Sequence, residues 1–339
     1  MNRKIRILFV RPLKSSFIQE DLKLLRKHFN VRVVDFVLSI RKKPKETLKT
    51  MFNMLTGVLW ADITFSWFAG YHAYWAVRLS KIFRKKSVAI VGGYEVAKVP
   101  EIGYGALLNP RSTRIVKYVL ENADRVLTVD NSLKKDAIKN LSVAGKNIQT
   151  VPTGYDYEKF KPEGEKENLV LTVSVGDSWE RIRLKGLDTF VKSAEFLSDV
   201  RFLVIGIQGG ALKKLQDFAS PNVEFLGSLL QDELIPYYQR AKVYCQLSMR
   251  EGLPNAVCET MLCECVPVGT DVQGVRTAIG DAGFYVPYGD VEATVEAIKK
   301  ALKSDNGKAA RERIQKMFPI ERREKELLRI IANEITKSG

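Results

Sequence analysis

Residues 251–259, with the sequence EGLPNAVCE, are the most informative stretch of the chain for its fold and function. Glu251 and Glu259 lie eight positions apart across a turn, and the second falls in an apolar, helix-like run. Pro254 and Asn255 predict a helix start, because proline suits a first helical position and asparagine caps free amides. The unpaired amides and the positive dipole end of such a helix favour a diphosphate. We therefore expect one site that holds a diphosphate, with two carboxylates to accept hydrogen bonds from sugar hydroxyls.

Further segments surround this motif in a fixed order. They are VPTGYD at 151–156, SMR at 248–250, CVPVGTD at 265–271, GVR at 274–276 and VPYGD at 286–290. Together with the two glutamates they resemble the donor site of retaining GT-B glycosyltransferases of family four. The resemblance covers residues 150–303 well and the first 150 residues only in outline. The alternative, two solvated carboxylates beside an ordinary helix, does not explain the ordered segments.

Length and alternation predict an α/β protein of two domains. The 339 residues exceed the roughly 100–200 of one domain. Short apolar strands alternate with helices, which is typical of parallel sheets covered on both faces. Strands are expected at 4–10, 31–37, 62–67, 87–93, 125–129, 168–176, 200–206, 222–227, 241–248 and 266–270.

The resemblance implies a GT-B fold, in which two Rossmann-like domains place parallel sheets across a cleft. We expect an acceptor and membrane domain over residues 1–155 and a nucleotide-sugar donor domain over residues 156–318. A charged amphipathic helix near 320–336 would cross back, so that residues 319–339 join the first domain.

The excess of positive over negative charge is confined to the first half of the chain. Residues 1–150 contain 28 Lys and Arg against 11 Asp and Glu, whereas the remainder contains 26 against 28. So basic a domain favours an anionic partner, either nucleic acid or an anionic membrane leaflet.

Residues 41–60 favour the membrane. Cations at Arg41, Lys42, Lys43 and Lys45 precede an apolar face with Leu48, Met51, Phe52, Leu55, Val58 and Leu59, and Trp60 ends the run. This pattern is typical of a helix in a bilayer interface. An ordinary helix packed on its own sheet remains an equal alternative, and the basic surroundings tip the interpretation toward the membrane.

Several patterns bear on location. The uncharged run at 63–77 is shorter than the ~20 residues of a spanning helix. The chain starts MNRKIRILFV, unlike a secretory signal, and the four cysteines show no CxxC spacing. We expect a cytoplasmic protein with reduced, buried thiols that lies at the inner membrane face.

The resemblance also implies roles for particular residues. Lys185 would reach the donor diphosphate, Glu251 the transferred sugar and Glu259 the ribose hydroxyls. The family often has an arginine where this chain has Asp177, so Arg181 or Arg183 would supply the second cation. The implied donor-binding residues are Gly176, Gly227, Ser248, Gly252, Leu253, Pro254, Asn255, Ala256 and Glu259.

In the first domain the resemblance indicates fewer residues. Gly92-Gly93-Tyr94-Glu95 resembles a His-Gly-x-Asp segment, so Gly93 and Glu95 are candidates for contact with acceptor or sugar. Trp67 stands where some relatives have a histidine, and His72 is expected in the core or at a helix cap.

The predicted reaction is retaining transfer of a hexose from a UDP- or GDP-sugar to a lipid-linked or glycan acceptor. No obvious base stands ready for an inverting reaction, and the family's same-face route uses the departing phosphate oxygen as proton acceptor. No Asp-x-Asp ends a strand, so we expect neither metal nor bound cofactor.

Three alternatives remain. A Rossmann dehydrogenase requires a GxGxxG after an early strand, and none follows the first strand here. A non-catalytic, transferase-like subunit would bind nucleotide without turnover. A nucleic-acid binder would use the basic half with a steep salt dependence.

Overall fold

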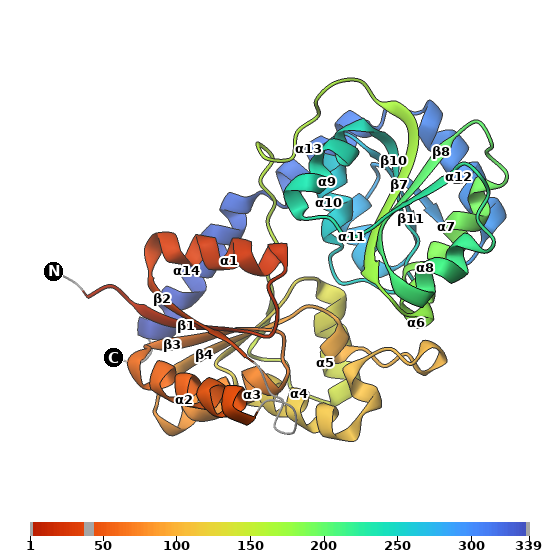
Figure 1. Cartoon of the computed structure of the whole chain (residues 1–339). Coiled ribbons are helices and arrows are strands. Elements are labelled where there is room, and N and C mark those ends of the chain that lie inside the picture. The colour runs from red at the N-terminus through yellow and green to blue at the C-terminus, as the bar shows by residue number, and fades with distance from the viewer. Residues whose placement is uncertain (1–2, 37–43, 337–339) are drawn as a thin grey trace. The chain divides into compact units, whose positions relative to one another are not determined.

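Two six-stranded parallel sheets organise the chain, one in each of two units (Figure 1). The structure is a computed structural model that describes residues 3–36 and 44–336. Unit 1 comprises Met1–Thr153 with Glu321–Gly339, and unit 2 comprises Gly154–Ile320. The predicted α/β class with two parallel, Rossmann-like sheets is confirmed.

Unit 1 has the strand order β2-β1-β3-β4-β5-β6. Its strands are β1 (Arg6–Arg11), β2 (Asn30–Asp35), β3 (Ile63–Trp67), β4 (Lys86–Val91), β5 (Arg125–Thr128) and β6 (Ile148–Thr150). Its helices are α1 (Ser16–His28), α2 (Pro44–Trp60), α3 (Tyr71–Ile82), α4 (Pro110–Asn122), α5 (Asn131–Leu141) and α14 (Ile320–Thr336), with 3-10 turns η1 (Tyr94–Val96), η2 (Pro100–Ile102) and η3 (Ala106–Leu108). Strands β1, β3, β4 and β5 are buried on both faces, as continuous hydrophobic runs require, whereas edge strand β2 is mostly exposed or half-buried.

Unit 2 has the strand order β12-β11-β10-β7-β8-β9. Its strands are β7 (Glu167–Gly176), β8 (Arg201–Ile207), β9 (Val223–Leu226), β10 (Ala241–Gln246), β11 (Val266–Thr270) and β12 (Phe284–Val286). Its helices are α6 (Trp179–Lys185), α7 (Leu187–Ala194), α8 (Gly209–Gln216), α9 (Gln231–Arg240), α10 (Asn255–Leu262), α11 (Gln273–Ile279), α12 (Val291–Lys303) and α13 (Gly307–Met317). The four cysteines of this unit are buried and free.

The last helix, α14, returns to unit 1, as predicted, and lies beside α1 (Figure 1). Arg323 of α14 is buried and forms a two-point ion pair with buried Asp21 of α1, at 2.7 and 3.0 Å. Asp21 also accepts the indole N–H of Trp67 at 2.9 Å. Because each buried charge is paired and hydrogen-bonded, the contact fixes where α14 docks.

Each sheet has one point where the strand order reverses. In unit 1 the chain runs from β1 outward to β2 and then continues with β3 on the other side of β1. In unit 2 the chain runs from β7 to β8 and β9, and then β10 pairs with the other side of β7. Ligands of open α/β sheets bind outside the carboxyl ends of the strands at such a point. The topology therefore marks one place for a ligand in each unit, outside the carboxyl ends of the strands where the order reverses.

Helix α2 presents two faces rather than the single apolar face expected from its sequence. Met54 and Val58 are buried against unit 1 together with Thr47 and Thr50. On the outside, Leu48, Phe52, Leu55 and Leu59 are exposed by 73, 64, 38 and 48% and recur at helical spacing. We call these four residues the outer stripe.

Two other parts of the segment expected to bind the membrane are its terminal tryptophan and its basic cluster. Trp60 does not stand free, because the guanidinium of Arg32 lies 4.1 Å from its ring centroid. Arg41, Lys42 and Lys43 lie outside the described residues. Over residues 3–36 and 44–336, no helix is long and apolar enough to cross a bilayer.

Candidate functional site

The loop after β10 gathers a polar cluster around one carboxylate. Oε1 of Glu251 accepts hydrogen bonds from the hydroxyl of Ser248 at 2.7 Å and from the amide of Gln246 at 2.9 Å. The same oxygen forms an ion pair with Nζ of Lys185. The side chains of Lys185 and Glu251 are 15 and 12% exposed, so the pair is shielded but not sealed from solvent. This cluster lies at the carboxyl ends of β7 and β10, the place that the topology of unit 2 marks.

A glycine brings the lysine to this loop. Helix α6 ends at Lys185, and Gly186 then adopts a left-handed φ of 63° before α7 begins. A Cβ atom on Gly186 would lie 2.0 Å from the carbonyl oxygen of Leu247. The amide of Met249 also donates to the carbonyl of Leu184 at 2.8 Å. The end of α6 and the loop after β10 therefore touch backbone to backbone.

A second glycine holds the loop from the other side. A Cβ atom on Gly274, in α11, would lie 1.6 Å from the carbonyl oxygen of Gly252. A larger residue at position 274 would push the helix away from the loop. Glu251 and Gly252 thus lie between α6 and α11, which fixes the backbone that carries the carboxylate.

Helix α10 begins at Asn255, with Pro254 in the capping position. The expectation that Asn255 caps the helix is wrong, because its side-chain oxygen accepts the hydroxyl of Tyr155 at 2.9 Å and the helix has no side-chain cap. The first amides of any helix have no carbonyl of that helix to bind. Those of α10, which follow Gly252 and Leu253 and include Ala256, can therefore serve an anion in front of the helix.

Glu259 lies one turn inside α10 and is 5% exposed. Its carboxylate accepts the side-chain amide of Gln231 at 2.6 Å and the hydroxyl of Tyr238 at 3.2 Å, both from α9. Burial raises the pKa of Glu259 to about 7, and the two hydrogen bonds offset part of that effect. Since each carboxylate oxygen can accept two hydrogen bonds, the group retains capacity for further hydroxyls.

The remaining donor-side residues lie at or after the end of β7 and after β9. Arg181 donates from Nε to the carbonyl of Val175 at 3.1 Å, and a Cβ atom on Gly176 would lie 2.4 Å from its side chain. The side chain of Arg183 is exposed. Gly227 follows β9 beside open space. The structure does not gather both arginines with Lys185 in the polar cluster.

The first-domain candidates form a separate group in unit 1. The carboxylate of Glu95 is buried and accepts the backbone amides of Ala69, Gly92 and Gly93 at 3.2, 3.2 and 3.0 Å. Burial raises its pKa, and the amide hydrogen bonds counteract that rise. His72 is buried, as expected, with Nε2 2.5 Å from the carbonyl oxygen of Trp67, and burial lowers its pKa to about 4.

Three site residues escaped the sequence reasoning: Gln246, Gln231 and Tyr238. Gln246 carried a usable signal, because a polar residue at the end of a buried strand is rarely placed there for packing. Gln231 and Tyr238 gave none, since their role depends on how α9 packs beside α10. No group of three or more His, Cys, Asp or Glu is placed to hold a metal ion in the part of the chain that the structure describes.

Comparison with known proteins finds similarity to glycosyl transferases. Residues 170–304 match the family model described as glycosyl transferases group 1. The GPI3 subunit of phosphatidylinositol N-acetylglucosaminyltransferase from Saccharomyces cerevisiae is 23% identical over 225 residues, which cover 61% of this chain and 49% of that protein. The chain thus spans about half the length of that curated relative.

Solved structures resemble the chain over almost its full length. Sucrose-phosphate synthase from Thermosynechococcus elongatus superimposes with a TM-score of 0.77 and 16% identity, covering 98% of this chain and 100% of that one. Anabaena Alr3699/HepE in complex with UDP-glucose gives 0.75 and 13%, covering 97% and 100%. The chain therefore has the GT-B glycosyltransferase fold, and residues 170–304 of its second unit match the group 1 glycosyl transferases.

Proposed function

We propose that the protein is a retaining glycosyltransferase that moves a hexose from a UDP- or GDP-sugar to a lipid-linked or glycan acceptor. The observation that carries the proposal is the Lys185–Glu251 cluster beside the start of α10, at the marked place of unit 2. The match of residues 170–304 and the likeness to a UDP-glucose complex support the same substrate class. Unit 2 would bind the donor and unit 1 the acceptor.

Lys185 would act on the leaving group. Its ammonium pairs with Glu251 in the structure, and a bound diphosphate would present more negative charge to the same cation. A positive charge placed where negative charge develops stabilises the transition state. Arg181 or Arg183 would add a second cation. Glu251 would then be free to accept hydroxyls of the transferred sugar.

The same-face route needs no protein base, because an oxygen of the departing phosphate takes the proton of the acceptor hydroxyl. We propose that the reaction requires neither a divalent metal nor a bound cofactor. Turnover unchanged by EDTA is the expected result, and loss of turnover that Mg²⁺ or Mn²⁺ restores would overturn this part of the proposal.

The role proposed for Glu259 supplies the direct test. Replacing Glu259 with alanine removes the acceptor for the ribose hydroxyls, so UDP or GDP affinity should fall about tenfold, the equivalent of one hydrogen bond to a charged group. Calorimetric titration measures the change. Glu292→Ala, at an exposed position of α12, is the control and should bind as the parent does. Equal affinities in all three proteins would refute the placement.

We further propose that unit 1 attaches the enzyme to an anionic membrane surface at the cytoplasmic side. The outer stripe of α2 exposes four large apolar side chains, and exposed Lys45 and Lys49 lie on the same helix. Apolar burial and lipid charge together suffice for such binding.

Flotation with vesicles that contain phosphatidylglycerol tests the membrane proposal. The Leu48→Asp, Phe52→Asp double variant should float much less than the parent, and neutralising Arg41, Lys42, Lys43 and Lys45 should have a similar effect. Ile82→Asp changes an exposed apolar residue at the far end of α3 and should float normally. An intact protein that stays in the pellet fraction at low salt would contradict membrane attachment.

A non-catalytic, nucleotide-binding subunit is the second candidate, and one observation favours it. Asp177 stands where the resemblance leads us to expect a phosphate-binding arginine, and Arg181 is hydrogen-bonded to a backbone carbonyl. Such a protein would bind UDP or GDP yet hydrolyse or transfer no sugar from any donor. Turnover with a panel of UDP- and GDP-sugars separates the two candidates.

A further inference from the structure

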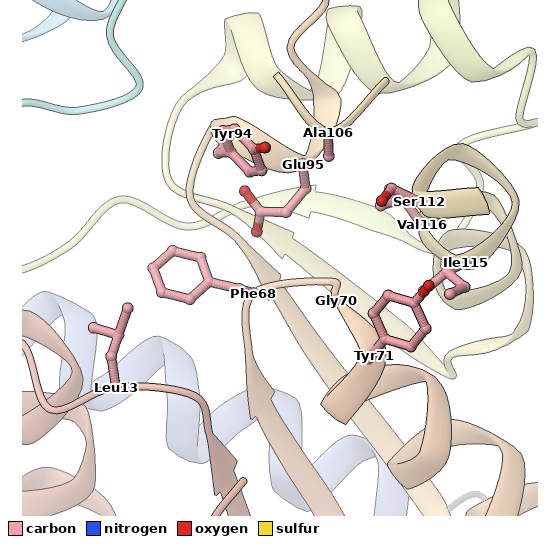
Figure 2. Close-up of a pocket in the computed structure, with 10 residues that line it drawn as sticks. All are labelled: Leu13, Phe68, Gly70, Tyr71, Tyr94, Glu95, Ala106, Ser112, Ile115 and Val116. Atoms are coloured by element: carbon pink, nitrogen blue, oxygen red, sulfur yellow. The ribbon is translucent and has the colours of Figure 1, made fainter. Parts of the chain in front are cut away.

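Unit 1 contains a pocket at the place that its own topology marks. The pocket has a volume of about 390 Å³. It is lined by Leu13, Phe68, Gly70, Tyr71, Tyr94, Glu95, Ala106, Ser112, Ile115 and Val116 (Figure 2). Leu13 follows β1 and Phe68 follows β3, the two strands between which the order reverses. This is where open α/β sheets bind ligands, and the volume lies in the range of small-molecule sites.

The walls of this pocket are apolar. Leu13 and Phe68 lie on one side, and Ile115 and Val116 of α4 lie on the other (Figure 2). Among the described residues that line the pocket, Glu95 brings the only carboxylate, and its two oxygens already accept three backbone amides. The carboxylate thus ties the loop after β3 to the loop after β4. Its role in the pocket is to position these loops.

The rim of the pocket leaves apolar side chains in water. Leu13, Tyr71 and Tyr94 are 47, 42 and 53% exposed, although each borders an apolar cavity. A hydrocarbon ligand would remove these side chains from water, which is favourable in proportion to the apolar area covered. A sugar gains less, because its hydroxyls need polar partners and these walls offer few beyond the hydroxyls of Ser112, Tyr71 and Tyr94.

The outer stripe of α2 points to the source of such a ligand. In a parallel sheet with crossover helices, every helix starts at the carboxyl edge of the strands, so the first turns of α2 and α3 share the edge at which the pocket lies. The ring of Phe36, which follows β2, lies 6.0 Å from that of His72, next to Tyr71 of the rim. The start of α2, where the outer stripe begins at Leu48, therefore lies at the same edge of unit 1 as the pocket.

We propose that this pocket binds the hydrocarbon chain of a membrane lipid that is the acceptor. The proposal rests on the proposed function and narrows its acceptor class from lipid or glycan to lipid. The chain of the lipid lies between Phe68 and Ile115. Exposed Arg111 and Arg114, on the helix that carries Ile115, offer positive charge to an anionic head group.

Calorimetric titration of the full chain with farnesyl phosphate and with dodecyl phosphate, both below micelle formation, tests the proposal. We expect saturable binding of at least one of them at one site, and no heat from inorganic phosphate. Preference for farnesyl phosphate would identify an isoprenoid chain, and preference for dodecyl phosphate an acyl chain. If neither lipid binds, or if inorganic phosphate binds equally well, the proposal is overturned.

Two variants and a control locate the binding. Ile115→Glu places a charge in the wall and should weaken lipid binding at least tenfold, whereas Ile82→Glu, exposed on α3 outside the pocket, should not. Ser112→Phe fills the cavity and should also weaken lipid binding. It replaces Ile115→Glu as the test if circular dichroism shows that Ile115→Glu does not fold. Unchanged lipid affinity in a folded pocket variant would contradict the proposal.

The nucleotide readout keeps the two proposals apart. UDP and GDP affinity, measured on the same samples, should be unaffected by both pocket variants, because unit 2 is not altered. If the protein binds lipid but no nucleotide, the proposed function is disproved and the proposal that the pocket binds lipid is retained. A protein that binds nucleotide but neither lipid would disprove the pocket alone.

Discussion

The two units place opposite chemistry at equivalent points of two similar sheets. At the reversal point of unit 2, Lys185, Glu251 and Ser248 form a charged and hydrogen-bonded cluster. At the reversal point of unit 1, Phe68 and Ile115 line an apolar cavity. The strand order determines where a ligand can sit, and the loop residues determine which ligand it is.

The two units also differ in which groups hold their carboxylates, Glu251 and Glu95. Glu251 is held by side chains, namely those of Lys185, Ser248 and Gln246, which can turn toward a ligand. Glu95 is held by backbone amides of two loops, which cannot turn without moving the loops. The first arrangement suits exchange of partners during a reaction, and the second suits the maintenance of a shape.

The largest expected effect concerns the charge in unit 2. Lys185→Ala should lower turnover by about 10²–10³-fold, because a cation that stabilises developing negative charge is lost. Donor affinity should change by less than about tenfold, since the charge acts mainly in the transition state. Steady-state kinetics with the best donor measure both.

A matched lysine serves as the control. Lys300→Ala removes an exposed lysine of α12 in the same unit and should leave turnover unchanged. Equal turnover of Lys185→Ala and the parent would exclude the role given to the cluster, and with it the contrast between the units.

The second effect concerns the buried carboxyl beside the cluster. Because burial raises the pKa of Glu259 from 4.5 to about 7, the folded protein holds this proton more tightly than the unfolded chain does. The free energy of unfolding should therefore fall as pH rises through this window, by about 3 kcal/mol from this group. The side chain introduced by Glu259→Gln cannot ionise, so from pH 5 to pH 8 the free energy of unfolding should fall less in the variant than in the parent. Urea denaturation at the two pH values measures the difference. An identical pH dependence in the two proteins would count against a buried, ionisable Glu259.

The smallest effect concerns the backbone that brings Lys185 to Glu251. Gly186→Ala should cost about 2 kcal/mol, because φ is 63° and the new Cβ atom would meet the carbonyl of Leu247. Gly227→Ala, where a Cβ atom meets open space, should stay within about 0.5 kcal/mol of the parent. Urea denaturation measures the free energy of unfolding of both variants. Equal values would show that the close approach of Gly186 to Leu247 does not constrain residue 186.

Much of the fold could be predicted from the sequence, because long apolar strands and amphipathic helices leave strong periodic signals. Strand β7 and helix α14 are examples, since their buried patterns were readable without tertiary information. Strands β6 and β12 were missed because three residues carry too little pattern. Helix α6 was not predicted, because seven residues carry too short a pattern.

The candidate site could be predicted in part. Glu251, Glu259 and Lys185 followed from local motifs, and the structure places Lys185 directly on Glu251. The partners of Glu259 could not be predicted, because they come from α9, which approaches α10 only in the folded sheet. The outer stripe of α2 shows the same limit, since Leu48 and Val58 share one apolar arc of the helix and only the packing shows that Val58 is buried and Leu48 exposed.

Amide hydrogen exchange with and without saturating UDP or GDP reports which segments a nucleotide protects. If unit 2 binds the nucleotide at the Lys185–Glu251 cluster, we expect slower exchange in peptides that cover residues 176–186 and 251–259, with residues 94–116 of unit 1 unchanged. Protection confined to residues 94–116, or no change at 251–259 under saturation, would show that the nucleotide does not bind there.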